Sequence, residues 1–474
     1  MKKYLSVFAA FTASQLCIAQ QSPYTPVDDP LAPITSGQYN FSGPGETFSP
    51  FYYDHITFTQ TSETNMTAKD RVHLQPGFHA GDYTGNGYFH AFIANPDFNV
   101  VFITPDEHLP QVGQFEKLEI GMQLPASVDQ QVNDFLADPN TGLNPFDPDK
   151  ISVEATFTNG LNSYTVYGFY YDEFTRDVNA MAPRAPANWI AQPTLYHWRI
   201  RFAPPFTGSW YCTIGIRVND EANPSYLVNG IYFTCVPSSN QGWLKKGNDN
   251  WHLAYSGSDA SFFALGQNIA WTDPIKPDYH TSFNGGNNPD VPNYPLYDAG
   301  YLDILNWIAD LSQSGGNMVR MSAVPWNYDV EFEHLNNYKD RMNRAWELDR
   351  VFDQCEQENM KISMEFEFIG KDDANGNPYF LWSNNPYHTE LSGVTDKAHF
   401  FSDPDARVAL KKKLRYFLSR WGYSTCLGIF ALTGEINGGF GSIDDYENSP
   451  SLQVSQTEWE EDLFQYSKAL MNYR

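Results

Sequence analysis

Ser424–Phe440 has the sequence STCLGIFALTGEINGGF and decides how the C-terminal half of the chain folds. Its apolar run, Leu427–Leu432, leads to the acid Glu435 three residues later and then to Asn437, which two glycines follow. A short apolar run bounded by turn residues predicts a buried strand, and the glycines predict a loop directly after it. We therefore expect a strand that ends at the protein surface and presents a carboxylate there.

The sequence on both sides of this strand alternates between strand-like and helix-like segments. The expected strands cover residues 261–271, 317–324, 361–368 and 426–432, and the expected helices cover residues 301–314, 341–359 and 404–420. Asp403 is expected to cap the last of these helices, with Pro404 at its first position. A capping box formed by Ser455 and Glu458 predicts one more helix beyond the strand. Together these segments make four βα units.

The connections between these units differ in length in a regular way. Those from helix to strand are short, whereas those from strand to helix are long and cover about residues 271–300, 325–335, 369–403 and 433–455. A (β/α)8 barrel has this pattern because its site is built from the loops that follow the strands. A doubly wound sheet is the alternative fold, but no glycine fingerprint follows the first strand.

The N-terminal half is expected to be all-β. Residues 20–50 are rich in Pro, Ser and Gly and predict a loosely packed arm, and short alternating runs predict a small β module over residues 51–110. Residues 111–240 predict an immunoglobulin-like β-sandwich, since strands such as 151–158 (ISVEATFT) place every second apolar residue on one face. The predicted architecture is multidomain: two all-β parts, followed over residues 241–474 by an α/β part that forms part of a TIM barrel.

The composition favours an exported protein that does not bind nucleic acid. The 474 residues carry a net charge of −26, whereas a phosphate backbone requires a basic surface. Residues 1–19 combine two lysines, an apolar stretch and small residues at the end, which predicts a signal peptide cleaved before Gln20 and a secreted or cell-surface protein. No other segment is long and apolar enough to predict a membrane span.

The cysteines beyond the predicted cleavage site form no CxxC pair, so we expect no structural metal site. Cys212 and Cys235 lie on two strand-like runs joined by a turn-rich segment. In a hairpin they would lie nearly opposite each other, which predicts a disulfide in an exported protein. Two buried free thiols are the alternative.

The motifs GQNIAW, NMVRM, KISMEFEF and GIFALTGEIN follow one another in the order of the first four strands of clan A glycoside hydrolase barrels, which residues 243–474 resemble. The segment from FEKLEIGMQLP to WYCTIGIRV resembles the immunoglobulin-like domain of unknown function that precedes such barrels in many bacterial glycoside hydrolases. The resemblance implies retaining hydrolysis of a polysaccharide without a cofactor. It also implies that Glu435 is the general acid/base and that the nucleophile lies on the seventh strand.

The same resemblance assigns substrate contacts. Arg320 matches an arginine that lies near the nucleophile, and Trp271 and Trp326 close their strands where sugar-stacking aromatics are found. Gly434 departs from the family pattern, which has an asparagine before the acid/base. Further side chains at strand ends and in the third long loop are expected to contact the glycan: Asn268, Asn437, Trp382 and His388.

A retaining glycosidase needs two carboxyl groups about 5–5.5 Å apart. Glu365 and Glu367 alternate with apolar residues in KISMEFEF, so both acids are expected on the face away from the helices. Glu367 would lie one strand away from Glu435 and is the candidate for the second carboxylate. The alternative is that Glu367 pairs with Arg320 and has a structural role.

The resemblance extends only through the fourth βα unit, and the chain ends about forty residues after Glu435. We therefore expect a truncated gene product or a partial sequence, with the nucleophile outside it. A rival interpretation is a non-catalytic glycan-binding or cell-surface scaffold protein. The expected partner in both cases is a polysaccharide or oligosaccharide.

Overall fold

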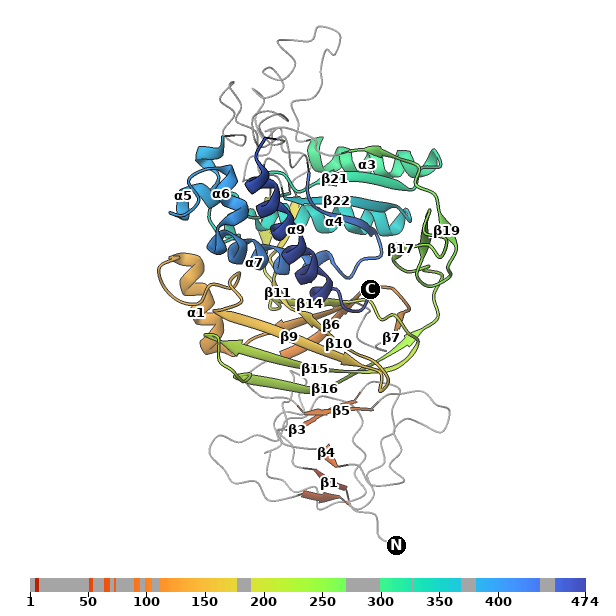
Figure 1. Ribbon diagram of the computed structural model, residues 1–474. Helices are drawn as coiled ribbons and strands as arrows, with labels where there is room; N and C mark the ends of the chain where they lie inside the picture. The colour runs from red at the N-terminus through yellow and green to blue at the C-terminus, as the bar shows by residue number, and fades with distance from the viewer. Residues whose placement is uncertain are drawn as a thin grey trace.

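The computed structural model describes residues 5–7, 51–53, 64–68, 72–73, 89–93, 99–104, 111–176, 189–269, 299–325, 328–367, 381–434 and 448–474. A β-sandwich and an α/β part with a parallel sheet dominate the structure (Figure 1). Toward the N-terminus, β1 (Leu5–Val7) pairs with β2 (Phe51–Tyr53) and β4 (Val72–His73), and β3 (Thr64–Ala68) pairs with β5 (Phe89–Ile93). None of the helices within these ranges is long and apolar enough to cross a membrane.

The sandwich consists of a five-stranded and a four-stranded sheet. The first has the order β10 (Ser163–Tyr167), β9 (Ile151–Thr158), β15 (Gly208–Val218), β16 (Tyr226–Val236) and β7 (Gln111–Gly113). The second has the order β11 (Phe169–Tyr170), β14 (Trp198–Phe202), β8 (Leu118–Gln123) and β6 (Asn99–Thr104). The alternation expected in β9 is confirmed, because Ile151, Val153, Ala155 and Phe157 are all buried. Phe157 stacks on Phe202 with ring centroids 4.3 Å apart, which joins the two sheets.

Three features of this part were not expected. β6 pairs with β8, so the sandwich begins before residue 111, and residues 99–104 do not belong to the small β module. The helix α1 (Ala126–Ala137) follows β8 and buries its apolar face. The strands β12 (Glu173–Arg176) and β13 (Trp189–Gln192) form a separate two-stranded ribbon.

The predicted disulfide between Cys212 and Cys235 is wrong. The hairpin of β15 and β16 forms as expected, but Cys212 pairs with Ile231 and Cys235 pairs with Gly208. The two cysteines are therefore displaced by four residues along the strands. That displacement is about 13 Å at ~3.3 Å per residue, which is too far for a disulfide. Both are buried free thiols, as the alternative held.

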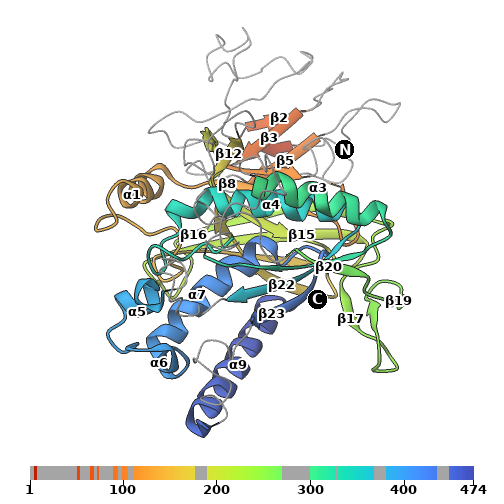
Figure 2. The ribbon, with the colours of Figure 1, turned by 90° about the horizontal axis from the view of Figure 1, so that it is seen from above.

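The α/β part is built on a parallel sheet with the order β20 (Gly266–Asn268), β21 (Met318–Ser322), β22 (Lys361–Glu367) and β23 (Leu427–Thr433). The intervening helices are α3 (Ala299–Gln313), α4 (Met342–Gln357), α5 (Pro386–Glu390), α6 (Lys397–Ser402) and α7 (Pro404–Trp421), and α9 (Pro450–Leu470) follows β23 (Figure 2). The strand order follows the chain order, unlike that of a doubly wound sheet, which reverses at a switch point. Within the described residues the sheet has these four strands and does not close on itself.

Local signals predicted most ends of these elements. Asp403 caps α7 as expected, with its side chain accepting a hydrogen bond from the Ala406 amide at 2.8 Å. The capping box at Ser455 and Glu458 is wrong, because α9 already begins at Pro450, whose fixed φ suits the first turn of a helix. The first expected strand is divided, since β19 (Ser261–Phe262) joins β17 (Leu244–Lys246) and β18 (Leu253–Tyr255) in an antiparallel sheet.

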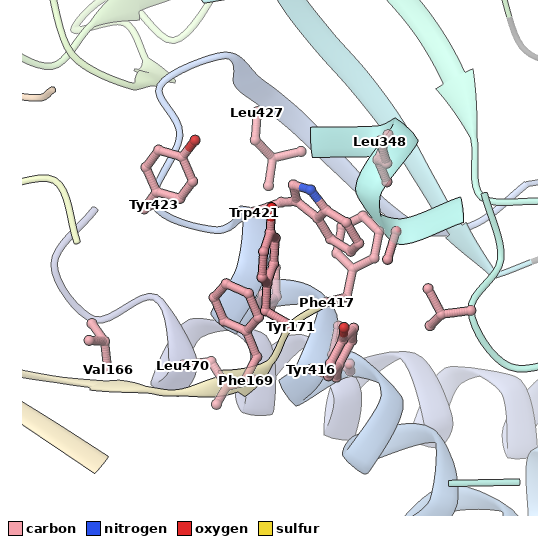
Figure 3. Close-up of a cluster of buried hydrophobic side chains, with 14 of the residues drawn as sticks. Val166, Phe169, Tyr171, Leu348, Tyr416, Phe417, Trp421, Tyr423, Leu427 and Leu470 are labelled. Carbon is pink, nitrogen blue, oxygen red and sulfur yellow. The ribbon is translucent and has the colours of Figure 1, made fainter. Parts of the chain in front are cut away.

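The sandwich packs directly on the helices of the α/β part. All five residues of β14 are buried: Trp198, Ile200 and Phe202 face the sandwich core, and the alternate residues Arg199 and Arg201 lie on the opposite face. Figure 3 shows Phe169 and Tyr171 of the sandwich among side chains of α7 such as Tyr416 and Trp421.

A buried set of charges crosses this boundary. We call it the interface network, and it consists of Glu119, Arg199, Arg201, Asp349 and Arg420. Arg201 donates hydrogen bonds to Glu119 at 2.5 Å and to Asp349 at 2.7 Å. Arg420 donates to Asp349 at 2.6 Å, and Arg199 donates to Glu119 at 3.0 Å. Because Asp349 lies on α4 and Arg420 on α7, these bonds join β8 and β14 to both helices.

Candidate functional site at the carboxyl end of the parallel sheet

Four polar side chains meet on neighbouring strands of the parallel sheet. We call them the strand-end cluster: Asn268, Arg320, Ser322 and Glu365. Arg320 donates a hydrogen bond to Asn268 at 3.3 Å and forms an ion pair with Glu365. Ser322 donates to the other carboxylate oxygen of Glu365. The register explains the meeting, because Asn268 pairs with Arg320 and Ser322 pairs with Glu365, so their side chains share one face.

The strand-end cluster is accessible to solvent chiefly at Arg320, whereas Ser322 is buried. The Arg320 side chain is 39% exposed, and the Glu365 side chain is 13% exposed. A guanidinium offers several N–H donors and an ionised carboxylate offers only acceptors. The pair can therefore donate a hydrogen bond to a hydroxyl oxygen and accept one from a hydroxyl hydrogen. The arrangement therefore suits a ligand rich in hydroxyl groups.

The end of β23 lies against this cluster. A Cβ atom built on Gly434 would lie 2.7 Å from Oε2 of Glu365, so any larger residue would have to displace the carboxylate. This contact gives a physical reason for a glycine at position 434. The predicted acid/base, Glu435, is the next residue along the chain. Four predicted site residues lie outside the described residues: Glu435, Asn437, Trp271 and Trp326.

Glu367, the other predicted carboxylate, has a different environment. Lys413 of α7 donates a hydrogen bond to Oε2 of Glu367 at 2.8 Å and pairs with Asp329 at 2.8 Å, and all three side chains are buried. The expectation that the two acids of β22 share the open face is met by Glu365 and not by Glu367. The alternative that Glu367 pairs with Arg320 is wrong, because Arg320 pairs with Glu365.

Glu331 completes this second group. We call the group the loop cluster, and it consists of Asp329, Glu331, Glu367 and Lys413. The hydroxyl of Tyr387 donates to Oε2 of Glu331 at 2.6 Å, and the amide of Asn336 donates to Oε1 at 2.7 Å. Burial raises the pKa of Glu331 to about 8, and the charge of Lys413 opposes this only in part. Sequence reasoning did not find Asp329, Glu331 or Lys413.

One of these residues left a signal in the sequence. Lys413 stands three residues after Leu410 and four before Phe417, so a helix places it on a face that is otherwise apolar. A lysine there requires a buried carboxylate, since a charge is rarely buried without a partner. No comparable pattern identifies Asp329 and Glu331, which belong to a loop.

Two further predicted contacts lie away from the strand-end cluster. Trp382 is buried and packs against His388 and Phe400, with ring centroids 5.9 Å and 6.3 Å away. His388 directs Nδ1 to the carbonyl of Val394 at 2.9 Å. In the described part of the chain, Trp382 and His388 therefore belong to the packing around α5 and α6. The same part holds no group of three or more His, Cys, Asp or Glu side chains placed to bind a metal ion.

Comparisons with known proteins give a family match over part of the chain and distant likenesses to solved structures. The model of a domain of unknown function, DUF5060, matches residues 111–217, which lie in the sandwich. No curated protein matches the chain. The chain is similar to a crystal structure from Bacteroides vulgatus ATCC 8482 described as a candidate glycoside hydrolase, with 15% identity and a TM-score of 0.40. The likeness covers 73% of this chain and 53% of that one, so this chain spans about half of that protein.

Proposed function

We propose that this chain is an exported carbohydrate-active protein derived from a retaining glycoside hydrolase, with Glu435 as the general acid/base. The observation that carries the proposal is the strand-end cluster. It places a half-exposed Arg320 and the carboxylate of Glu365 on one face of a parallel sheet, next to the residue that precedes Glu435. In this proposal the four βα units are the first half of a (β/α)8 barrel, whose site lies at the carboxyl ends of its strands.

Within this proposal, Arg320, Asn268 and Glu365 contact the glycan beside Glu435. The side chains at 271, 326 and 437 supply further stacking and hydrogen bonds. Trp382 and His388 pack within the third long loop. They affect the ligand only through the shape of that loop. Export follows from the signal peptide that residues 1–19 predict, with cleavage before Gln20.

The second carboxylate of a retaining pair is not provided by Glu365 or Glu367 in this proposal. Both oxygens of Glu365 accept hydrogen bonds, from Arg320 and from Ser322. Glu367 is buried and its carboxylate is paired with Lys413. A nucleophilic carboxylate has to reach the anomeric carbon of the sugar, which such partners oppose. The proposed nucleophile is therefore a carboxylate other than Glu365 and Glu367.

Because Glu365 and Glu367 are bonded to other side chains, a second candidate function is favoured, that of a glycan-binding protein without turnover. In that case the strand-end cluster binds sugar hydroxyl groups, and Glu435 is one more ligand contact. The sandwich, whose family match is to a domain of unknown function, is a scaffold in both interpretations.

The two candidates are separated with the full chain and a panel of soluble polysaccharides. Binding is measured by affinity electrophoresis and hydrolysis by the release of reducing sugar, for the wild type, Glu435→Gln and the control Glu458→Gln on the exposed side of α9. General acid catalysis contributes about 10²–10⁴-fold, so loss of hydrolysis by that factor in Glu435→Gln alone supports the enzyme. Binding without release of sugar shows that this chain does not turn the glycan over and supports the binding protein, and absence of binding to every glycan contradicts both.

A further inference from the structure

The loop that follows β21 is fastened to two helices by the buried carboxylates of the loop cluster. Asp329 pairs with Lys413 of α7 at 2.8 Å. Glu331 accepts the hydroxyl hydrogen bond of Tyr387, on α5, at 2.6 Å. These bonds hold residues 328–337 close to the carboxyl ends of β21 and β22, where the strand-end cluster lies.

The charges of this cluster do not balance. Asp329, Glu331 and Glu367 supply three carboxylates, whereas Lys413 supplies one cation, and all four are buried. Arg341 lies nearby and donates to the backbone carbonyl of Asp329, but its guanidinium is paired with Glu333. Among the described residues, these three neighbouring carboxylates would repel one another strongly if all were ionised away from water. At least one carboxylate is therefore expected to keep its proton.

The geometry identifies which carboxylate this is. Asp329 and Glu367 each lie 2.8 Å from the ammonium group of Lys413, which stabilises their ionised forms. In the part of the chain that the structure describes, the hydrogen-bond donors to Glu331 are neutral groups, the hydroxyl of Tyr387 and the amide of Asn336. Either oxygen of the Tyr387–Glu331 bond can carry the bridging hydrogen, so a protonated Glu331 keeps this contact. Of the three acids, Glu331 is the one that can be protonated at the lowest cost in free energy.

We propose that Glu331 carries a proton at neutral pH and that its ionisation loosens the loop of residues 328–337, which makes this loop a pH-dependent latch over the strand-end cluster. When Glu331 loses its proton to solvent, a new negative charge appears beside Asp329 and near Glu367. Within the described ranges, Lys413 is the cation that opposes it. The loop then lowers the energy by moving Glu331 toward water.

The other titratable groups around Glu331 do not change charge in the same range. Burial and nearby carboxylates hold the pKa of Tyr387 and of Tyr338 well above its usual value. Burial would lower the pKa of Lys413, but Asp329 and Glu367 outweigh it and keep the pKa raised. The step near pH 8 therefore belongs to Glu331, whose pKa burial raises to about 8.

The sign of the effect on stability follows from the direction of this shift. The native state holds a proton on Glu331 that the unfolded chain releases above its usual pKa of 4.5. The contribution of Glu331 to stability is therefore complete below pH 4.5, and it is lost as the pH rises to about 8. Across this range the folding equilibrium constant falls by up to about tenfold per pH unit, and above it the contribution is constant.

Glu331→Gln tests this directly, because glutamine resembles the protonated acid and cannot ionise. Urea unfolding of the full chain is measured from pH 5 to pH 9.5 for the wild type, Glu331→Gln and Glu333→Gln, a matched control on the exposed side of the same loop. The ratio of folding constants, wild type to Glu331→Gln, should fall steeply up to about pH 8 and then level. The ratio to Glu333→Gln should stay flat. A flat ratio for Glu331→Gln overturns the proposal.

Hydrogen exchange measures the latch itself. Peptides covering residues 328–338, which include the amide of Asn336, should lose protection in the wild type above about pH 8, after correction for the intrinsic rate. In Glu331→Gln they should keep it. A wild-type loop that remains protected at pH 9.5, or equal losses in both proteins, contradicts the latch.

A second variant keeps the proposal testable if Glu331→Gln folds poorly. The Tyr387 hydroxyl stabilises the ionised form of Glu331, so Tyr387→Phe should move the midpoint of loop opening above about pH 8. A midpoint that falls or does not move counts against the latch. None of these measurements uses a glycan, so their failure would leave the proposed function standing, and the reverse also holds.

Discussion

Two buried charge networks in this molecule behave in opposite ways. The interface network joins the sandwich to α4 and α7 with three arginines and two carboxylates. The loop cluster joins the loop after β21 to α5 and α7 with one lysine and three carboxylates. Both lie away from water, so burial alone does not distinguish them. The difference is which charge is in excess.

The pKa values follow that excess. Burial acts to raise the pKa of Asp349, but Arg201 and Arg420 outweigh it and hold the pKa well below its usual value. Burial also acts to raise the pKa of Glu119, but nearby cations, chiefly Arg201, outweigh it and lower that pKa. Glu331 has no arginine partner, so burial prevails and its pKa rises. The comparison teaches that the pKa of a buried carboxylate in this fold falls where two guanidinium groups bracket it and rises where its hydrogen-bond donors are neutral.

Removing the central anion of the interface network should have the largest effect. Asp349→Ala leaves the guanidinium groups of Arg201 and Arg420 buried without a shared partner. Breaking a buried ion pair in this way costs about 3–5 kcal/mol of unfolding free energy. Urea unfolding followed by tryptophan fluorescence measures the loss.

The matched control is Asp353→Ala, which lies one turn away on the same helix. Asp353 pairs with Lys117, also across the boundary, but its side chain is 25% exposed, so its loss should cost at most about 1 kcal/mol. Equal losses for the two variants would show that the interface network has no special role. Separate unfolding transitions for the sandwich and the α/β part in the wild type would argue against the network as the joint between them.

A substitution in the loop cluster should lower the unfolding free energy less at neutral pH than Asp349→Ala does. Its effect should depend more steeply on pH. Lys413→Met removes the ammonium group that pairs with Asp329 and Glu367. These two acids can take up protons instead, which limits the loss to about 3 kcal/mol. Since the variant then holds native-state protons that the unfolded chain releases, its deficit should grow from pH 5 to pH 7.5. Urea unfolding at the two pH values measures it.

Lys411→Met is the control for this variant. Lys411 lies on the same helix and pairs with Asp462 at 2.7 Å, but the side chains are 30% and 34% exposed. Its loss should therefore be small and should not change between the two pH values. A deficit of Lys413→Met that shrinks as the pH rises would contradict the charge balance described above.

The elements of the fold that depend on neighbouring residues were predictable from the sequence. Asp403 and Pro404 begin α7, the alternation in β9 gives its buried face, and the chain order gives the order of the parallel strands. The register of β15 on β16 was not predictable, because the position of the turn between the strands sets it. The irregularity after Cys212 changes the pairing by one residue only, whereas the cysteines are displaced by four, and so the disulfide prediction failed.

The candidate site was predictable only in part for a related reason. The sequence places Arg320 and two acids of β22 near the carboxyl end of the sheet, but a difference of two residues decides which acid Arg320 meets. The structure selects Glu365, and the long side chain of Lys413 takes Glu367. Such a choice depends on how far α7 lies from β22, and no local pattern encodes that distance.

The smallest effect on stability is expected at the strand-end cluster, where Arg320 is 39% exposed and Glu365 also accepts a hydrogen bond from Ser322. Arg320→Gln should change the unfolding free energy by less than about 1 kcal/mol, because exposed ion pairs contribute little. Its effect on glycan binding should be larger, since hydrogen bonds from a charged donor to a ligand contribute about 1.5–3 kcal/mol, or about tenfold or more in affinity. Affinity electrophoresis with the polysaccharide that binds the wild type most tightly provides the measurement.

The sandwich offers a matched pair for this comparison. Arg217 also pairs with a glutamate on the neighbouring strand, Glu154, and the two side chains are 30% and 26% exposed. Arg217→Gln should therefore match Arg320→Gln in stability and leave glycan binding unchanged. If both variants bind as the wild type does, the strand-end cluster is a structural ion pair like that of the sandwich. If only Arg320→Gln binds weakly, the position of the pair at the carboxyl end of the parallel strands, and not its chemistry, makes it a site.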